Sequence, residues 1–127
     1  NFPFSYWVNQ EIEKIRNQEN TPIDFFPDFL HRGFYYEQLE RYYQFFPVEN
    51  ILVIEHRELK NNRISTLRKI EQFLNISYVD WNTINLDDKF VSQYNVKLPS
   101  DIRNKLKAFF KPYNEKFYKL IKRNFDW

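Results

Sequence analysis

Histidines beside charged residues are the side chains of this sequence from which acid–base chemistry or metal binding would be built. His56 lies in the run Glu55-His56-Arg57-Glu58, which could form an acid–base cluster or supply two ligands to a metal ion. A metal-binding helix places two ligands four residues apart, and that spacing does not occur around His56. The simpler interpretation is the solvated end of a strand with surface ion pairs, each worth under about 1 kcal/mol.

Two further positions could bind an anion. His31 is followed by Arg32 and Gly33 and could contact an anion, although capping or loop packing explains it as well. Ser5 stands where a helix is predicted to begin, and the free N–H groups and dipole of a helix start favour an anion. Simple capping by the serine hydroxyl is the alternative. The residues alone therefore suggest anion binding without identifying the anion.

The last quarter of the sequence is strongly basic. Its cations are Arg103, Lys105, Lys107, Lys111, Lys116, Lys119, Lys122 and Arg123, and Glu115 is the one acid between residues 103 and 123. Such a stretch could attract a polyanion such as nucleic acid, anionic lipid or a sulfated glycan. It could equally be the solvated face of an amphipathic helix, with Lys122 and Arg123 near its negative C-terminal end.

Composition limits the classes of protein to which the chain could belong. Its 127 residues are enough for one domain, or a piece of one, and the first residue is Asn, as in an internal segment or a processed end. With 20% aromatic residues the chain is expected to fold, and with one glycine it has no glycine-rich phosphate cradle. The absence of cysteine excludes disulfides and thiolate chemistry. No apolar run is long enough to span a bilayer, and a net charge of +2 is too small to mark a nucleic-acid binder.

The spacing of apolar residues predicts mostly helical structure. Helices are predicted from Ser5, from Tyr35 to Phe46 before Pro47, from Ile64 to Leu74, and from Ser100 onward, the last one broken or restarted at Pro112. The second helix carries an aromatic stripe that could stack sugars or bases, although stripes at this spacing are usually core. Residues 75–99 form a long connection without clear periodicity, and loops of that length tend to be functional or mobile.

One strand is predicted, at Ile51–Ile54. The run is short, apolar and rich in β-branched residues, which favours a strand buried on both faces, as in a parallel sheet. A strand needs neighbours, and no other convincing strand is visible in the sequence. The sequence therefore predicts that the rest of the sheet lies outside these 127 residues.

Three stretches, taken in order, resemble the nucleotide-dependent sulfotransferases, above all their bacterial and heparan-sulfate-type branch. Residues 33–59, GFYYEQLERYYQFFPVENILVIEHREL, are similar to the family segment in which a helix opened by Gly-x-Tyr leads through Phe-Pro to an Ile-Leu-Val strand. Residues 65–76, STLRKIEQFLNI, resemble the helix Thr-Leu-x-x-Ile-x-x-Phe-Leu-Gly-Leu. Residues 97–127, KLPSDIRNKLKAFFKPYNEKFYKLIKRNFDW, resemble a C-terminal signature that ends in Phe-x-Trp.

The resemblance implies an α/β parent fold, the three-layer P-loop sulfotransferase sandwich around a parallel sheet. Within it this chain would be the mostly helical C-terminal portion of one domain, with a single short strand at 51–54. The implied reaction is transfer of a sulfuryl group from 3′-phosphoadenosine 5′-phosphosulfate (PAPS) to a hydroxyl or amine, leaving 3′-phosphoadenosine 5′-phosphate (PAP). The family's phosphate loop and general base are absent from residues 1–127, so the isolated chain is expected to be inactive.

The resemblance also implies particular site residues. Phe4-Ser5-Tyr6-Trp7 is similar to the end of the family's Arg…Ser element, which makes Ser5 the candidate ligand of the donor's 3′-phosphate. The 75–99 connection falls where the family places a loop that lines donor and acceptor. The candidates there are Tyr94, Asn95 and Lys97 on the donor side and Lys89 on the acceptor side, joined by His31. No catalytic residue and no metal ligand is assigned.

The expected partners are a small-molecule or glycan acceptor and the missing N-terminal part of the domain, supplied by the same or another chain. We do not expect binding to nucleic acid, to a membrane or to a metal. We expect a cytoplasmic location. The alternative function is a non-catalytic module that binds a polyanion or a protein through its basic C-terminal helices.

Overall fold

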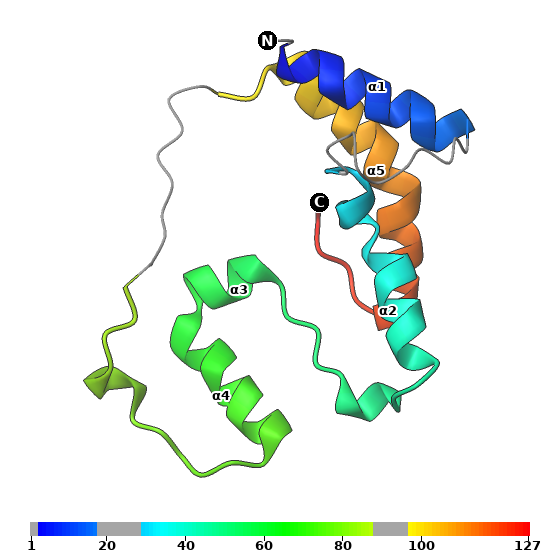
Figure 1. Ribbon diagram of the computed structural model, residues 1–127. Coiled ribbons are helices and arrows are strands. Elements are labelled where there is room, and N and C mark those ends of the chain that lie inside the picture. The colour runs from blue at the N-terminus through cyan, green and yellow to red at the C-terminus, as the bar shows by residue number, and fades with distance from the viewer. Residues whose placement is uncertain (1–2, 18–28, 88–96) are drawn as a thin grey trace. The chain divides into compact units, whose positions relative to one another are not determined.

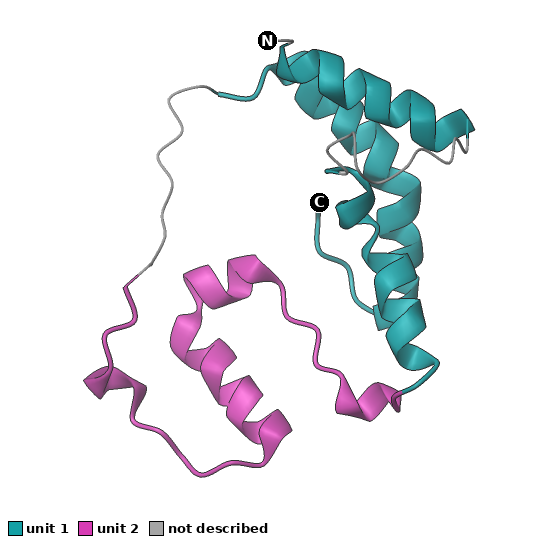
Figure 2. Cartoon of the chain, in the orientation of Figure 1, with its two compact units in different colours: residues 1–45, 96–127 teal, residues 46–95 magenta. Residues whose placement is uncertain are grey.

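The computed structural model describes residues 3–17, 29–87 and 97–127. Within these ranges the chain forms five α-helices and three short 3-10 helices, and no strand (Figure 1). They are α1 (Phe4–Asn17), η1 (His31–Gly33), α2 (Tyr35–Tyr43), η2 (Val48–Asn50), α3 (His56–Asn61), α4 (Arg63–Leu74), η3 (Trp81–Thr83) and α5 (Ser100–Ile121). The chain divides into two compact units, residues 1–45 with 96–127 (unit 1) and residues 46–95 (unit 2), as Figure 2 shows.

Unit 1 is built on α5, against which both α1 and α2 pack. Its buried core joins Val8 and Ile12 of α1 with Leu30 and with Ile102 of α5. Five partly buried apolar residues surround this cluster, namely Ile15, Leu98, Leu106, Phe109 and Phe110. Because Val8, Ile12 and Ile15 recur at helical spacing, the apolar face predicted for the first helix is confirmed.

Aromatic rings continue this core along α5. Phe34, which directly precedes α2, is buried and stacks on Tyr113 of α5 with ring centroids 4.1 Å apart. Further along α5, Phe117 is buried and lies parallel to Trp127, with centroids 5.9 Å apart. Residues 122–127 reach this position because Lys122 ends α5 in the left-handed conformation (φ 53°).

The predicted break at Pro112 is wrong, because α5 runs without interruption from Ser100 to Ile121. Proline inside a helix removes one backbone hydrogen bond and crowds the preceding turn, at a cost of about 3 kcal/mol. The rings on both sides of Pro112 offset this cost, since Phe109, Phe110 and Tyr113 all lie within about 6 Å, centroid to centroid, of Phe34. The helix begins at Ser100, as predicted, so Ser100 is its first residue and not its N-cap. That position belongs to Pro99, and no side chain caps the first turn.

Unit 2 contains α3 and α4, which pack against each other. They are separated by Asn62, whose carbonyl accepts hydrogen bonds from the N–H (2.9 Å) and the hydroxyl (2.9 Å) of the fully buried Thr66. An ion pair of 3.7 Å between Lys69 and Glu58 joins the two helices. The predicted helix at 64–74 is confirmed, whereas α3 was not predicted, because the charged run after residue 54 reads as the solvated end of a strand.

The predicted strand at 51–54 is not formed in the described structure. The backbone there is extended, with φ −125° and ψ 113° at Ile51, but no described residue pairs with it in a ladder. Leu52 is 38% exposed, although the sequence predicted a strand buried on both faces. An extended backbone depends on local sequence, but a strand also needs a neighbouring strand for its hydrogen bonds. The apolar run therefore makes the backbone extended without forming a strand.

The aromatic stripe of α2 is core only in part. Leu39 is buried and Tyr36 is half-buried, but Tyr42 and Phe46, which the spacing placed on the same face, are 59% and 52% exposed. Phe46 lies beyond the end of α2 at Tyr43, so its predicted place on that face is not realised. The hydroxyl of Tyr36 donates to the carboxylate of Glu40 (2.6 Å), which raises the pKa of the phenol.

Gly33 is predicted to be intolerant of a side chain. A Cβ at this position would lie 2.7 Å from Cε1 of Phe110, whose ring is held by Phe34 and Phe109. We therefore expect Gly33→Ala to lower the free energy of unfolding by about 1–3 kcal/mol, through overpacking. Chemical denaturation should show this loss, and Phe110→Leu in the same chain should recover part of it. If the two substitutions are simply additive, the contact with Phe110 is not the cause.

Candidate functional site

The first turn of α1 contains the predicted donor-site serine. Ser5 is half-buried and lies within the helix, which already begins at Phe4, so it is not the cap that the sequence suggested. The N–H of Tyr6 donates to the carbonyl of Pro3 at 2.9 Å, which closes the turn. No acidic side chain lies in this turn. The partial positive charge of this helix start is therefore not neutralised by a carboxylate of the turn.

Lys97 lies at the same end of unit 1. Its neighbour Leu98 packs on the cluster that contains Val8, which is about one helical turn after Ser5. Figure 1 shows the start of α5 beside the start of α1. The side chain of Lys97 is exposed, so its charge is available near this helix start. The other residues predicted on the 75–99 connection, Lys89, Tyr94 and Asn95, lie outside the described residues.

His31 is positioned by a buried glutamate of α1. The carboxylate of Glu11 accepts a hydrogen bond from the N–H of Leu30 at 2.6 Å and one from the N–H of His31 at 3.4 Å. It thereby binds the amides at the start of η1, where helical donors lack partners. Glu11 is six residues from Ser5, or about 9 Å of helix rise, so His31 and Ser5 share unit 1 but occupy different parts of α1.

The side chain of His31 lies at an open hollow of about 420 Å³, lined also by Arg32, Glu37 and Arg41. Its Nε2 is 3.8 Å from the carboxylate of Glu37, and its ring meets Phe34 edge to face at 5.3 Å. The carbonyl of Arg32 accepts a hydrogen bond from the side chain of Gln38 (3.0 Å). Both interpretations of His31 thus have support, since it packs on Phe34 and lies beside two arginines.

The basic C-terminal stretch does not form one continuous surface. Lys105 donates to Asn9 of α1 (2.5 Å), Lys116 lies over the ring of Tyr36 (5.8 Å), and Arg123 lies over Phe125 (4.8 Å). Arg103 and Lys107, by contrast, share a helix face one turn apart and are exposed. The helix faces therefore divide the cations, which favours the solvated-face interpretation over a single polyanion track.

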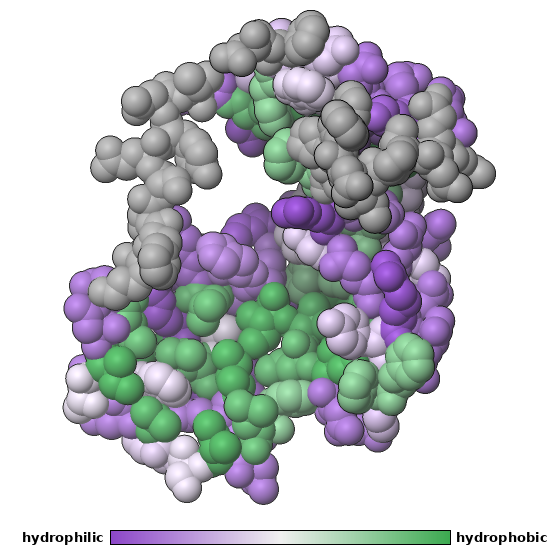
Figure 3. Space-filling model, in the orientation of Figure 1, coloured by the Kyte–Doolittle hydropathy of each residue, from purple (hydrophilic) through white to green (hydrophobic). Residues whose placement is uncertain are grey.

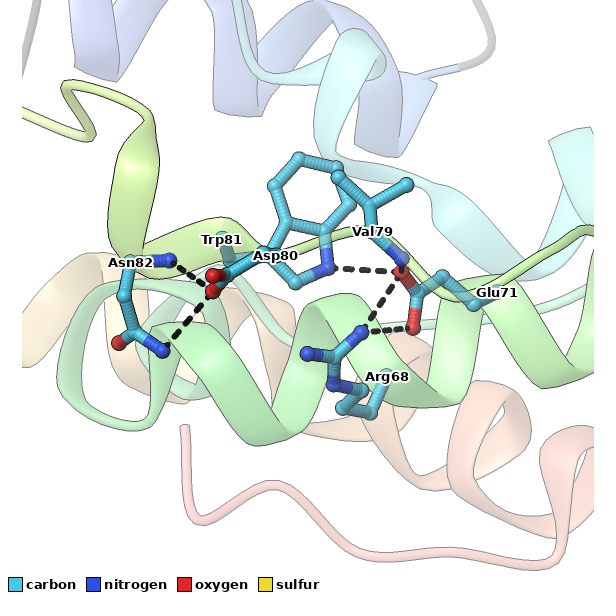
Figure 4. Close-up of polar contacts among 6 residues, drawn as sticks. All are labelled: Arg68, Glu71, Val79, Asp80, Trp81 and Asn82. Atoms are coloured by element: carbon cyan, nitrogen blue, oxygen red, sulfur yellow. Dashed lines mark hydrogen bonds and ion pairs between the residues drawn. The ribbon is translucent and has the colours of Figure 1, made fainter.

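Unit 2 has its own buried carboxylate, Glu71 of α4 (Figure 4). It accepts hydrogen bonds from the guanidinium of Arg68 (2.7 and 2.9 Å), the N–H of Val79 (2.9 Å) and the indole N–H of Trp81 (2.9 Å). The hydrogen bond from Arg68 is the main cause that holds the pKa of Glu71 below its ordinary value. The cluster fastens the chain after α4 onto that helix, and Arg63 assists by donating to the carbonyl of Leu86.

Sequence reasoning missed both buried glutamates. The signal was present, because Glu11 stands beside Ile12 on the face of Val8, and Glu71 stands beside Ile70 one turn after Leu67. A carboxylate on an apolar helical face is costly unless it accepts hydrogen bonds, so it predicts donors nearby. Which backbone amides would supply them could not be read from the sequence, because those donors are brought in by the tertiary fold.

The described residues contain neither a candidate metal site nor a helix that could span a membrane. No three His, Asp or Glu side chains gather there in a way that could hold a metal ion. No helix in the same residues is sufficiently long and apolar to cross a membrane. Glu55 and Arg57 form an ion pair of 2.6 Å beside His56, so the predicted ion pairing is present. The predicted strand end is wrong, because α3 begins at His56, and the side chain of Glu55 is only 14% exposed.

The comparisons with known proteins identify the family. Residues 3–85 match the sulfotransferase domain, and this chain belongs to that family. The membrane-associated sulfotransferase kil1 of Dictyostelium discoideum is 33% identical over 77% of this chain. Heparan sulfate glucosamine 3-O-sulfotransferase 5 is 25% identical over 73% of the chain in its human form and 24% identical over 73% in its mouse form. The resemblance in the sequence is thereby confirmed.

The match covers only part of each relative. The aligned part of the chain corresponds to 20% of kil1 and to 32% of the human 3-O-sulfotransferase. The family is therefore established for this chain, while the donor, the acceptor and the roles of Ser5, Lys97 and His31 remain predictions.

The Glu71 cluster predicts a pH dependence of stability. Because the pKa of Glu71 is lowered in the folded chain, the stabilisation is fully present above the ordinary glutamate pKa of 4.5 and is lost as pH falls through the lower, folded value. We expect the Trp81 indole N–H signal in NMR spectra to persist at pH 4.5 and to weaken only as the pH falls below that ordinary glutamate pKa. In Glu71→Gln that signal should be weakened already at neutral pH.

Glu13 provides the matched control, because it makes the same i,i+3 pair with Arg16 (3.3 Å) but on the surface. Glu13→Gln should leave the Trp81 signal and its pH profile unchanged. An equal effect of both substitutions would contradict a specific role for the buried cluster.

Proposed function

We propose that residues 1–127 form the C-terminal portion of a PAPS-dependent sulfotransferase domain, which transfers a sulfuryl group to a hydroxyl or amine. The observation that supports this most is the family match, which includes the first turn of α1 where Ser5 lies. In this proposal the chain contributes scaffold and part of the 3′-phosphate side. The phosphate loop and the general base come from the rest of the domain.

The donor side of the proposal is supported by the electrostatics at the start of α1. A phosphate there would accept a hydrogen bond from the hydroxyl of Ser5 and would lie in the positive field of the helix dipole. Lys97, at the same end of unit 1, adds a cation within the reach of a flexible side chain. Tyr94 and Asn95 are kept as further donor-side candidates.

Sulfuryl transfer resembles phosphoryl transfer, in which positioning and electrostatic stabilisation contribute most of the catalysis. The role proposed for this chain is therefore to hold the far end of the donor, so that its sulfate is fixed in line with the acceptor. No step assigned to these residues needs a metal.

The acceptor is proposed only by class. The relatives' names point to heparan sulfate glucosamine in one case and to a membrane-associated enzyme in the other. For this chain we propose a small molecule or a glycan that presents a hydroxyl or amine, with His31 and Lys89 on the acceptor side. A cytoplasmic location is part of the same proposal.

The exposed apolar surface of unit 2 supports the proposal that a sheet lies elsewhere in the domain. Its described surface exposes many large apolar side chains, and Figure 3 shows hydrophobic residues gathered over this unit. They are Phe46, Val48, Leu52, Ile64, Phe73, Leu74, Ile76, Tyr78 and Ile84. Exposed apolar surface of this kind marks an interaction site. We propose that other strands of the sulfotransferase domain pair with residues 51–54 and cover this surface.

The first test concerns Ser5. In the longest natural protein that contains this chain, Ser5→Ala should weaken PAP binding about 10- to 100-fold, as expected for one hydrogen bond to a charged group. Isothermal titration calorimetry would measure it. Ser65→Ala is the control, because Ser65 also lies in a first helical turn, in α4 of unit 2, where its hydroxyl donates to Asn62 (3.0 Å). Unchanged PAP affinity in Ser5→Ala would remove Ser5 from the proposed site.

The second test concerns the division of the domain. The 127 residues alone should transfer no measurable sulfuryl group from radiolabelled PAPS, because the loop that holds the donor's sulfate is not among them. Robust turnover by the purified chain would overturn this part of the proposal.

The third test concerns residues 51–54. The amides of residues 52–54 should exchange with solvent at nearly unfolded rates in the isolated chain, because no described acceptor binds them, whereas the N–H of Ile51 donates to the carbonyl of Val48 (3.1 Å). In the longer protein, ladder hydrogen bonds should slow the exchange about 100-fold or more. Amide exchange of residues 68–74 in α4 serves as the internal reference. Fast exchange at 51–54 in the longer protein would contradict the proposed strand.

A further inference from the structure

Unit 1 contains a second hollow, separate in its lining from the one beside His31. It has a volume of about 330 Å³ and lies between Gly33, the middle of α5 and Trp127. Small-molecule sites begin at about this size and are lined mainly by apolar and aromatic side chains with a few polar groups. Neither the family resemblance nor the proposed donor site uses this hollow.

The walls are apolar. Leu106 and Phe110 of α5 are half-buried, and Gly33 brings the backbone of η1 against the Phe110 ring. Two aromatic side chains stand at the rim: Tyr35 is 47% exposed and Trp127 is 43% exposed. These two rings meet edge to face at 5.7 Å, so both present ring surface near the opening. A flat apolar body is the ligand shape that such walls favour.

Two cations line the same hollow. Arg103 and Lys107 lie four residues apart on α5 and are exposed. Like charges at this spacing repel each other and destabilise a helix slightly. The structure shows neither of them in an ion pair with the described residues. A bound anion would form ion pairs with both side chains and reduce the repulsion between them.

We propose that this hollow binds a small ligand with a flat apolar body and one anionic group, of the aryl sulfate or aryl carboxylate class. The body lies against Leu106, Phe110 and Trp127, and the anion lies between Arg103 and Lys107. Charge complementarity selects this occupant over an uncharged one. The proposal stands independently of the donor site at Ser5.

The test uses 2-naphthyl sulfate as the probe and the 127-residue chain in NMR titrations. Gly33 is the only glycine of the sequence, so its amide is a distinctive reporter of the hollow, and the Trp127 indole is a second one. Both signals should shift saturably. Uncharged 2-naphthol should bind about tenfold more weakly or worse, because it lacks the group that the two cations recognise.

Paired variants separate a site from general charge attraction. Arg103→Gln with Lys107→Gln should weaken the affinity for 2-naphthyl sulfate about tenfold or more. Lys111→Gln with Lys119→Gln removes the same charge from exposed positions of α5 outside the hollow and should change the affinity less than about twofold.

Three outcomes with the 127-residue chain overturn the proposal. They are no saturable shift at Gly33 and Trp127, equal binding of 2-naphthol and its sulfate, and equal weakening by the two paired variants. The comparison of the two probes needs only the natural sequence, so it decides the matter even where a variant folds poorly. Loss of the shifts in the longer natural protein would also overturn it, since the hollow would then be filled by protein.

Discussion

The hydrogen bonds between the Glu11 carboxylate and the amides of Leu30 and His31 are the interaction on which unit 1 depends. A buried carboxylate is tolerated only when charge-assisted hydrogen bonds replace its hydration. Here the donors come from a segment about 20 residues later, so the charge fixes where the chain returns to α1. Leu30 is thereby delivered to the core, and His31 to Gly33 follow it as η1.

Unit 2 also contains a buried carboxylate that is stabilised by hydrogen bonds from a later segment. Glu71 binds the amide of Val79 and the indole of Trp81, and it adds the guanidinium of Arg68 from its own helix. In both units one carboxylate binds a backbone N–H of a segment that comes later in the chain. These hydrogen bonds specify where each segment lies, in addition to the packing of its apolar side chains.

The sequence predicted local structure better than it predicted contacts. The helices at 64–74 and in the first apolar stretch follow from periodicity, which acts within a few residues. Two failures are local, since Ser5 is not a cap and α3 was not predicted, but three others involve distant partners. Pro112 is carried through α5 by rings packed on Phe34, residues 51–54 stay extended because no described strand lies beside them, and α2 leaves Tyr42 exposed. The family resemblance allowed Ser5 and Lys97 to be predicted as site residues. The hollow between Gly33 and Trp127 could not be predicted, because three separate stretches of chain line it.

The matched domain region ends at residue 85, yet part of it packs against α5, which lies beyond that end. Val8 and Ile12 of the matched region are buried against Ile102, which lies outside it. Phe34, also matched, is buried under Tyr113 of the same helix. If α5 were a separate appendage, the apolar face of α1 would be exposed and the first turn with Ser5 would lose its support. The basic, aromatic C-terminal stretch therefore packs in one unit with part of the matched region and supports the helix that carries Ser5.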